Sequence, residues 1–245
     1  MSALTEALSA RADDLAERAM GEMYRNPFWD ERFGERGRRF AREDGRYHIT
    51  YLVSALEAEG TDILTAYAVW LRGVLVPRGM CSRHLAKNFA RLVEGIRSAE
   101  IPDGETACAY LQHAIEALRY AGGAAGAVQE AAPELSRAAL ERLVADHPNW
   151  PARMAPLGLD RCRDDLQYHL SYLADSLALE RADLFQDYLC WIVGFLERRG
   201  VPRQDLDTAL AALAEAIDER LSPSAAVPAR ELLSAGRLAV AESGA

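Results

Sequence analysis

Two stretches of the chain share the phrase Tyr-His-x-x-Tyr-Leu, one beginning at Tyr47 and the other at Tyr168. They lie 168 − 47 = 121 residues apart, about half of the 245-residue chain. An imidazole flanked by phenol rings can hold a ligand through hydrogen bonds, and it can equally pack inside a helical core. The repeated phrase therefore predicts either a duplicated pocket or a duplicated piece of core.

A carboxylate precedes each histidine by one helical turn, since Asp44 lies four residues before His48 and Asp165 four before His169. Positions i and i+4 are neighbours on a helix, so each carboxylate can orient a ring nitrogen of its histidine. This arrangement suits a ligand site, but it also suits a half-buried core histidine satisfied by the aspartate. Small residues and tyrosines flank the histidines, namely Ala55, Ser176, Tyr51 and Tyr172.

A second repeated pattern places two aromatic residues and a glycine at intervals of three. Glycine inside a helix costs roughly 0.5–1 kcal/mol relative to alanine, so we expect a close approach at this point. Packing against another helix would explain it, and so would a flat ligand lying against tryptophan and backbone. The residues are Tyr67, Trp70 and Gly73 in one copy and Tyr188, Trp191 and Gly194 in the other.

The two copies differ where one reads MCSRHL and the other VPRQDL. Cys81 and His84 lie at an expected helix amino terminus, where the helix dipole favours a thiolate. Cys81 is thus a candidate for covalent attachment of a ligand, and with His84 it supplies half of a zinc site. An ordinary, partly exposed cysteine remains the alternative.

The offset of 121 residues extends far beyond the opening phrase, which indicates a tandem repeat. Between residues 40 and 96, 20 of the 57 residue pairs at this offset are identical. The stretch 120–133, YAGGAAGAVQEAAP, is rich in small residues and ends in proline, so it reads as a linker or helix break. We therefore expect one domain over residues 1–122 and a second over 123–245, each of ordinary size.

Apolar residues recur at helical spacing and no alternating strand pattern is found, so the sequence predicts an all-α fold of two similar bundles of about five helices. Asp62 and Asp183 are expected N-caps of the third helices. Gly79 and Gly200 are expected left-handed helix stops. The expected helices cover 5–24, 33–59, 62–77, 82–98, 104–120, 127–146, 157–180, 183–198, 203–220 and 227–242.

Composition and motifs exclude several function classes. The net charge of −9 disfavours nucleic-acid binding, and no apolar run reaches the ~18 residues of a membrane span. No secretory signal is visible, and four scattered cysteines favour a reducing cytoplasm. The chain lacks a GxSxG elbow, a glycine-rich phosphate loop and an HExxH motif, so we expect a protein that is not an enzyme.

The stretches YHLSYLADSLALERADLFQDYLCWIVGFLERRGVP and WDERFGERGRRFAREDGRYHITYL resemble the helical, globin-like or phycobiliprotein-like modules of bacterial regulators. Some of these modules stand beside cobalamin-binding domains, and some hold a linear tetrapyrrole such as biliverdin and act as light or ligand sensors. The resemblance covers most of each copy. The cobalamin motif Asp-x-His-x-x-Gly is absent, which argues against cobalamin as the ligand of this chain.

The resemblance implies a tetrapyrrole site walled by the repeated tyrosines and tryptophans. The Asp-His pairs would face the pyrrole nitrogens, and Arg42 or Arg163 would pair with the propionates. Cyclic haem, the second choice, would use the same imidazole as an axial ligand. We therefore expect a sensor or carrier, in tandem duplicate, that signals through a separate output protein. The alternative is a ligand-free helical module that contacts protein partners, and the oligomeric state is open, a homodimer included.

Overall fold

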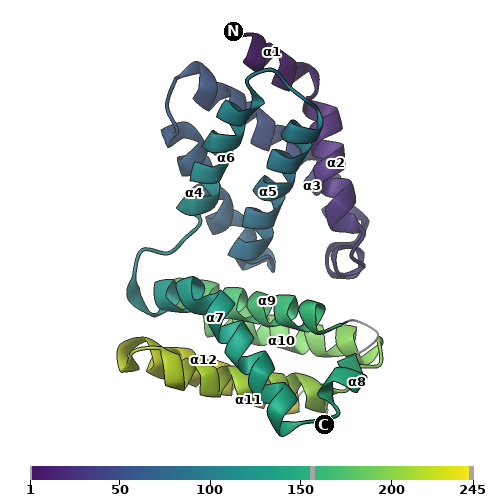
Figure 1. Cartoon of the computed structure of the whole chain (residues 1–245), viewed down its shortest axis with the longest axis vertical. Coiled ribbons are helices and arrows are strands. Elements are labelled where there is room, and N and C mark those ends of the chain that lie inside the picture. Colours follow the sequence, from purple (N-terminus) through teal and green to yellow (C-terminus); the bar gives the residue numbers. More distant parts are fainter. Residues whose placement is uncertain (1, 155–157, 243–245) are drawn as a thin grey trace. The chain divides into compact units, whose positions relative to one another are not determined.

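The computed structural model describes residues 2–154 and 158–242, and their regular structure is helical throughout, with no strand among them (Figure 1). The prediction of an all-α fold is confirmed. Within the described residues, no helix is both long enough and apolar enough to cross a lipid bilayer. By their contacts the helices form two compact units, which are described separately below.

The first unit comprises Met1–Leu75 and Arg83–Leu118. The helix expected over 5–24 breaks at Arg11, whose φ of −108° and ψ of 10° are not helical. The helix expected from residue 33 begins earlier and bends at Gly34, where φ is 60°. The helices are α1 (Ala3–Ala10), α2 (Ala12–Tyr24), α3 (Phe28–Glu57), α4 (Asp62–Leu75), α5 (Ser82–Ser98) and α6 (Gly104–Ala117).

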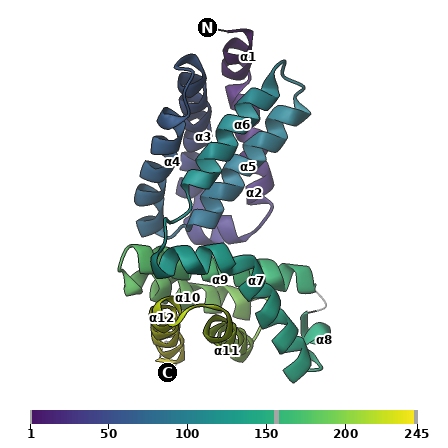
Figure 2. The ribbon, with the colours of Figure 1, turned by 60° about the vertical axis from the view of Figure 1, so that its left-hand side comes forward.

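The second unit comprises Val76–Ser82, which contains the short 3-10 helix η1 (Val76–Arg78), and Arg119–Ala245. Its helices α9 and α10 pack together, and Figure 2 shows α11 and α12 beside each other and nearly end-on. The helices are α7 (Gly123–Asp146), α8 (Trp150–Met154), α9 (Leu159–Ala178), α10 (Ala182–Glu197), α11 (Arg203–Arg220) and α12 (Pro223–Glu242).

The linker expected over residues 120–133 is mostly helix. Gly122 and Gly123 have φ of 78° and 65°, a left-handed conformation that glycine adopts without strain, and α7 begins there. Pro133 then lies inside α7 instead of closing a loop. The helix α8 was not predicted, and the expected start of the following helix, residue 157, lies outside the described residues.

Helix ends follow the sequence signals in part. Gly79 and Gly200 have φ of 93° and 78°, so the predicted left-handed stops are confirmed. Asp183 is not an N-cap, because Arg181 occupies the cap position and binds the Asp183 carboxylate with its guanidinium. The aspartate instead lies in the first turn, where its charge still favours the helix amino terminus.

Candidate functional site

His48 of α3 is buried and bonded through both ring nitrogens. Its Nδ1 is hydrogen-bonded to the Tyr67 hydroxyl of α4 at 2.7 Å, and its Nε2 lies 3.3 Å from the amide nitrogen of Asn88 on α5. The ring also packs against Phe89 at 5.0 Å between centroids. Burial lowers the pKa of His48 to about 3, so the imidazole is neutral at physiological pH.

The expectation that Asp44 orients His48 is wrong, because Tyr67 and Asn88 take both ring nitrogens. Burial raises the pKa of the Asp44 carboxyl, and the neighbouring Glu43 raises it further. Asp44 also lies near enough to Tyr67 to raise the pKa of that phenol, after the larger effect of burial. The half-buried carboxylate therefore stands beside the tyrosine and not on the imidazole.

The second unit repeats the histidine–tyrosine contact at the same offset of 121 residues. Nδ1 of His169 on α9 is hydrogen-bonded to the hydroxyl of Tyr188 on α10 at 2.8 Å, and burial lowers the pKa of His169 to about 4. Asp165 is again not the partner, since it forms an ion pair with Arg161 at 2.9 Å. The position of Asn88 is taken by Ala209, which has no amide to offer.

Both tyrosines that hold a histidine stack on a second tyrosine. The rings of Tyr51 and Tyr67 are 3.9 Å apart and within 12° of parallel, and those of Tyr172 and Tyr188 are 3.6 Å apart and within 11°. In the first unit the stack continues to Trp70, 6.0 Å from Tyr67 at an angle of 28°. Trp191, the matching residue of the second unit, stacks instead on Phe195.

The two stacks differ in exposure. In the first unit Tyr51 is 38% and Trp70 58% exposed, and Tyr47 one turn before Tyr51 is 57% exposed. In the second unit Tyr172 is only 3% exposed. The set Tyr47, Tyr51, Tyr67 and Trp70 is called the aromatic face below.

The second stack is covered by the segment 76–82, which belongs to the same unit. The hydroxyl of Tyr172 donates to the backbone carbonyl of Gly79, and the buried carboxylate of Asp175 accepts from the backbone N–H of Ser82 at 2.7 Å. The Ser82 hydroxyl and the Tyr120 hydroxyl also donate to Asp175. Sequence reasoning missed Asp175, although it is an acid in the apolar stretch LSYLADSL, where the first copy has Ser54.

The glycines of the third helices meet no closely packed partner. A Cβ atom built at Gly73 would meet nothing within 4 Å, and one at Gly194 would meet only the end of the Arg198 side chain at 3.5 Å. The expectation that another helix approaches closely at these positions is wrong, whereas the close approach of a flat ligand stays a prediction. Both positions have room for a methyl group in this structure.

Cys81 and His84 are both buried. Cys81 is fully inaccessible, whereas attachment of a pigment needs a thiol that the pigment can reach. His84 packs between Phe28 and Trp29, with centroid distances of 5.2 and 4.7 Å. Among the described residues no three histidine, cysteine or acidic side chains come together as a metal site, so the half zinc site finds no completion there.

The predicted propionate partners lie on the surface. Arg42 is exposed. It lies five residues before Tyr47 on α3, so at about 100° per residue the two side chains leave the helix about 140° apart. Arg163 is also exposed and pairs with Asp160 at 3.0 Å. Arg42 therefore leaves α3 on a different side from Tyr47, whereas Asp44 is a charged group that acts on Tyr67 of the aromatic face.

Comparison with known proteins adds no identity to this geometry. No protein-family model matches the chain, and neither the curated proteins nor the solved structures contain a significant match. The functional interpretation therefore depends on the residues themselves.

Proposed function

We propose that this chain is a non-enzymatic binding protein, formed by duplication of one helical module, whose aromatic face takes up a flat, conjugated ligand. A linear tetrapyrrole such as biliverdin is the preferred ligand class. The observation that carries the proposal is the exposed end of the ring stack formed by Tyr51, Tyr67 and Trp70. A conjugated ring system extends such a stack by the offset packing that aromatic rings favour.

Asp44 supports a ligand that donates hydrogen bonds. Its carboxylate is half-buried near Tyr67, and pyrrole N–H groups are the donors that a linear tetrapyrrole would present to it. Haem fits the first unit less well, because an axial ligand needs a free ring nitrogen and both nitrogens of His48 are bonded. In this proposal His48 positions Tyr67 and does not touch the ligand.

The duplication is supported by equivalent contacts in the two units as well as by sequence identity. The histidine–tyrosine hydrogen bond and the tyrosine stack recur in the two units at one offset. The proposal includes a globin-like or phycobiliprotein-like ancestry of the module and a sensory role through a separate output protein. The described cysteines are all free thiols, which supports a location in the reducing cytoplasm.

A second candidate function is the docking of a partner protein on the same face. Ile63 of α4 is 39% exposed, on the same stripe of the helix as Trp70, and large exposed apolar side chains of this kind are typical of protein interfaces. In that case the face needs no small ligand.

Titration of the purified protein with biliverdin tests the proposal. A shifted visible absorption band and quenched tryptophan fluorescence are expected. Trp70→Ala should weaken binding at least tenfold, because it removes the exposed end of the stack. Trp191→Ala is the matched control in the second unit and should leave binding unchanged. If the absorption spectrum of biliverdin does not change at any protein concentration, the ligand proposal fails and the docking function remains.

A further inference from the structure

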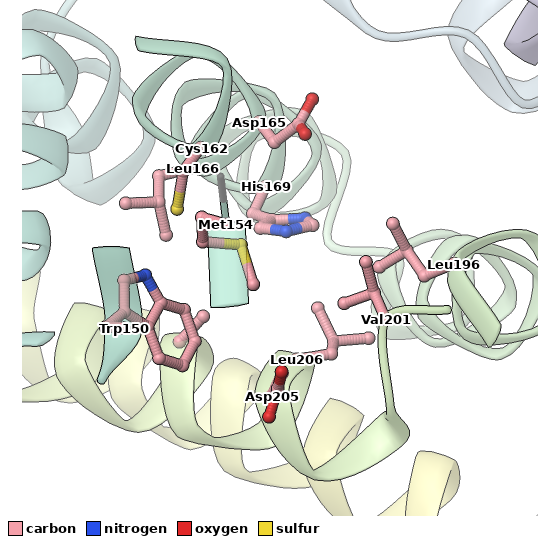
Figure 3. A pocket seen from close by; sticks show the side chains of 11 residues that line it. Trp150, Met154, Cys162, Asp165, Leu166, His169, Leu196, Val201, Asp205 and Leu206 are labelled. Carbon is pink, nitrogen blue, oxygen red and sulfur yellow. The ribbon is translucent and has the colours of Figure 1, made fainter. Parts of the chain in front are cut away.

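The second unit contains a pocket with a cavity volume of about 50 Å³. It lies between α8, α9 and α11, with Leu196 and Val201 from the end of α10 and the segment after it (Figure 3). Apolar side chains make up most of the wall. The polar groups that line it are those of Trp150, Cys162, Asp165, His169 and Asp205.

The first unit fills the equivalent space with larger side chains. Offset by 121 residues, Asn88 stands for Ala209 and His84 stands for Asp205. Asn88 lies against Nε2 of His48, and His84 packs on Trp29, the counterpart of Trp150. The pocket therefore lies where the second unit lacks the amide and imidazole that occupy the matching positions of the first.

One buried side chain on this pocket has a ring nitrogen without a hydrogen-bond partner among the described residues. His169 is 5% exposed, and its hydrogen bond to Tyr188 uses Nδ1 and leaves Nε2 for the pocket. Trp150 is 1% exposed, and its Nε1–H is directed towards the sulfur of Cys162, a weak acceptor (Figure 3). Because an unmade hydrogen bond of a buried group is costly, Nε2 of His169 indicates a bound molecule.

The pocket has little net charge. Asp205 is paired with Arg153, and Asp165 is paired with Arg161. The imidazole of His169 is neutral at pH 7. Burial raises the pKa of the Cys162 thiol, and this effect is larger than the lowering by the hydrogen bond from the Trp150 N–H. A charged ligand would therefore find no opposite charge that is free to pair with it. An uncharged ligand fits this balance.

We propose that this pocket binds a small, uncharged aliphatic alcohol of about three to five non-hydrogen atoms. The size follows from the volume, because a cavity of about 150 Å³ holds benzene and one water needs about 10–15 Å³. The ligand hydroxyl can donate to or accept from Nε2 of His169. The alkyl chain lies against Leu166, Val201 and Leu206. This site is in the second unit and does not depend on the aromatic face.

Saturation-transfer NMR on the full chain with 1-propanol tests the inference. Transfer to the propanol methyl group and a shift of the His169 imidazole nitrogen resonance are expected. Ala209→Asn restores the side chain of the first unit and should weaken binding at least tenfold. Ala211→Asn makes the same change on α11 outside the pocket lining and should bind as the unchanged protein does.

Ala209→Val provides a second way to fill the pocket if the asparagine variant fails to fold. It adds two methyl groups without a polar atom and should also abolish the transfer. Absence of transfer in the unchanged protein would mean that the pocket holds only water and would overturn the proposal. Equal binding by either folded Ala209 variant would do the same.

Discussion

The hydroxyl of Tyr172 donates a hydrogen bond to the backbone carbonyl of Gly79 at 2.8 Å. Tyr51, which occupies the same position in the first copy, remains 38% exposed. The two units therefore share the histidine–tyrosine hydrogen bond and the tyrosine stack but differ in what covers the stack. This difference directs the functional proposal to the first unit, although the sequence alone treats the two copies alike.

Tyr67→Phe should destabilise the chain by about 1–3 kcal/mol, because Nδ1 of buried His48 would lose its partner. Tyr188→Phe should have an effect of similar size through His169. Urea denaturation followed by circular dichroism measures both. If the free energy of unfolding fell by less than about 0.5 kcal/mol, the usual range of surface substitutions, the Tyr67–His48 hydrogen bond would not be a stabilising contact.

Stability should fall as the pH drops below about 6.5, the ordinary pKa of histidine. Burial depresses the pKa of His48 to about 3 and of His169 to about 4, so the folded state favours neutral rings. As the pH falls, the histidines are protonated in the unfolded chain before they are protonated in the folded one. Each histidine therefore lowers the free energy of unfolding by at most about 1.4 kcal/mol per pH unit until its folded pKa is reached. The raised pKa of Asp44 acts in the opposite direction.

Comparison with His48→Gln and His169→Gln isolates the histidine contribution from that of the acids. Urea midpoints measured between pH 7 and pH 5 should change less in each variant than in the unchanged protein. Equal slopes in all three proteins would contradict the assignment of neutral buried imidazoles.

Asp175→Ala should cost about 2–4 kcal/mol, because this buried carboxylate accepts hydrogen bonds from Ser82 and Tyr120. Hydrogen exchange at the Ser82 amide should accelerate in the same variant. Tyr120→Phe removes one of the contacts and serves as the milder control. Unchanged protection of Ser82 would show that Asp175 does not hold the segment 76–82 in place.

Gly73→Ala should stabilise the chain by about 0.5–1 kcal/mol. The added methyl group meets no atom within 4 Å, and alanine loses less backbone entropy than glycine in a helix. Thermal melting detects the change as a higher Tm. A lower Tm would reveal a contact at Gly73 that the structure does not show, and it would revive the expectation of a close approach.

Local patterns predicted the helices better than they predicted the site. Periodicity and the stops at Gly79 and Gly200 located most helices to within a few residues, because these signals act over one or two turns. The partner of His48 could not be found in this way. Spacing along one helix favoured Asp44, but Tyr67 reaches the ring from another helix, a contact set by tertiary packing. Tertiary contacts also explain why the sequence did not predict the role of Asn88 or the covering of the second stack by residues 76–82.

The segment 76–82 has a further consequence for how the copies can be separated. By sequence it belongs to the first copy, yet its contacts assign it to the second unit. In a fragment that starts at Arg119, Tyr172 would lose its hydrogen bond to Gly79, and Asp175 would lose the one from Ser82. No single cut of the chain therefore isolates the complete second unit, because α5 and α6 of the first unit lie between residues 76–82 and Arg119.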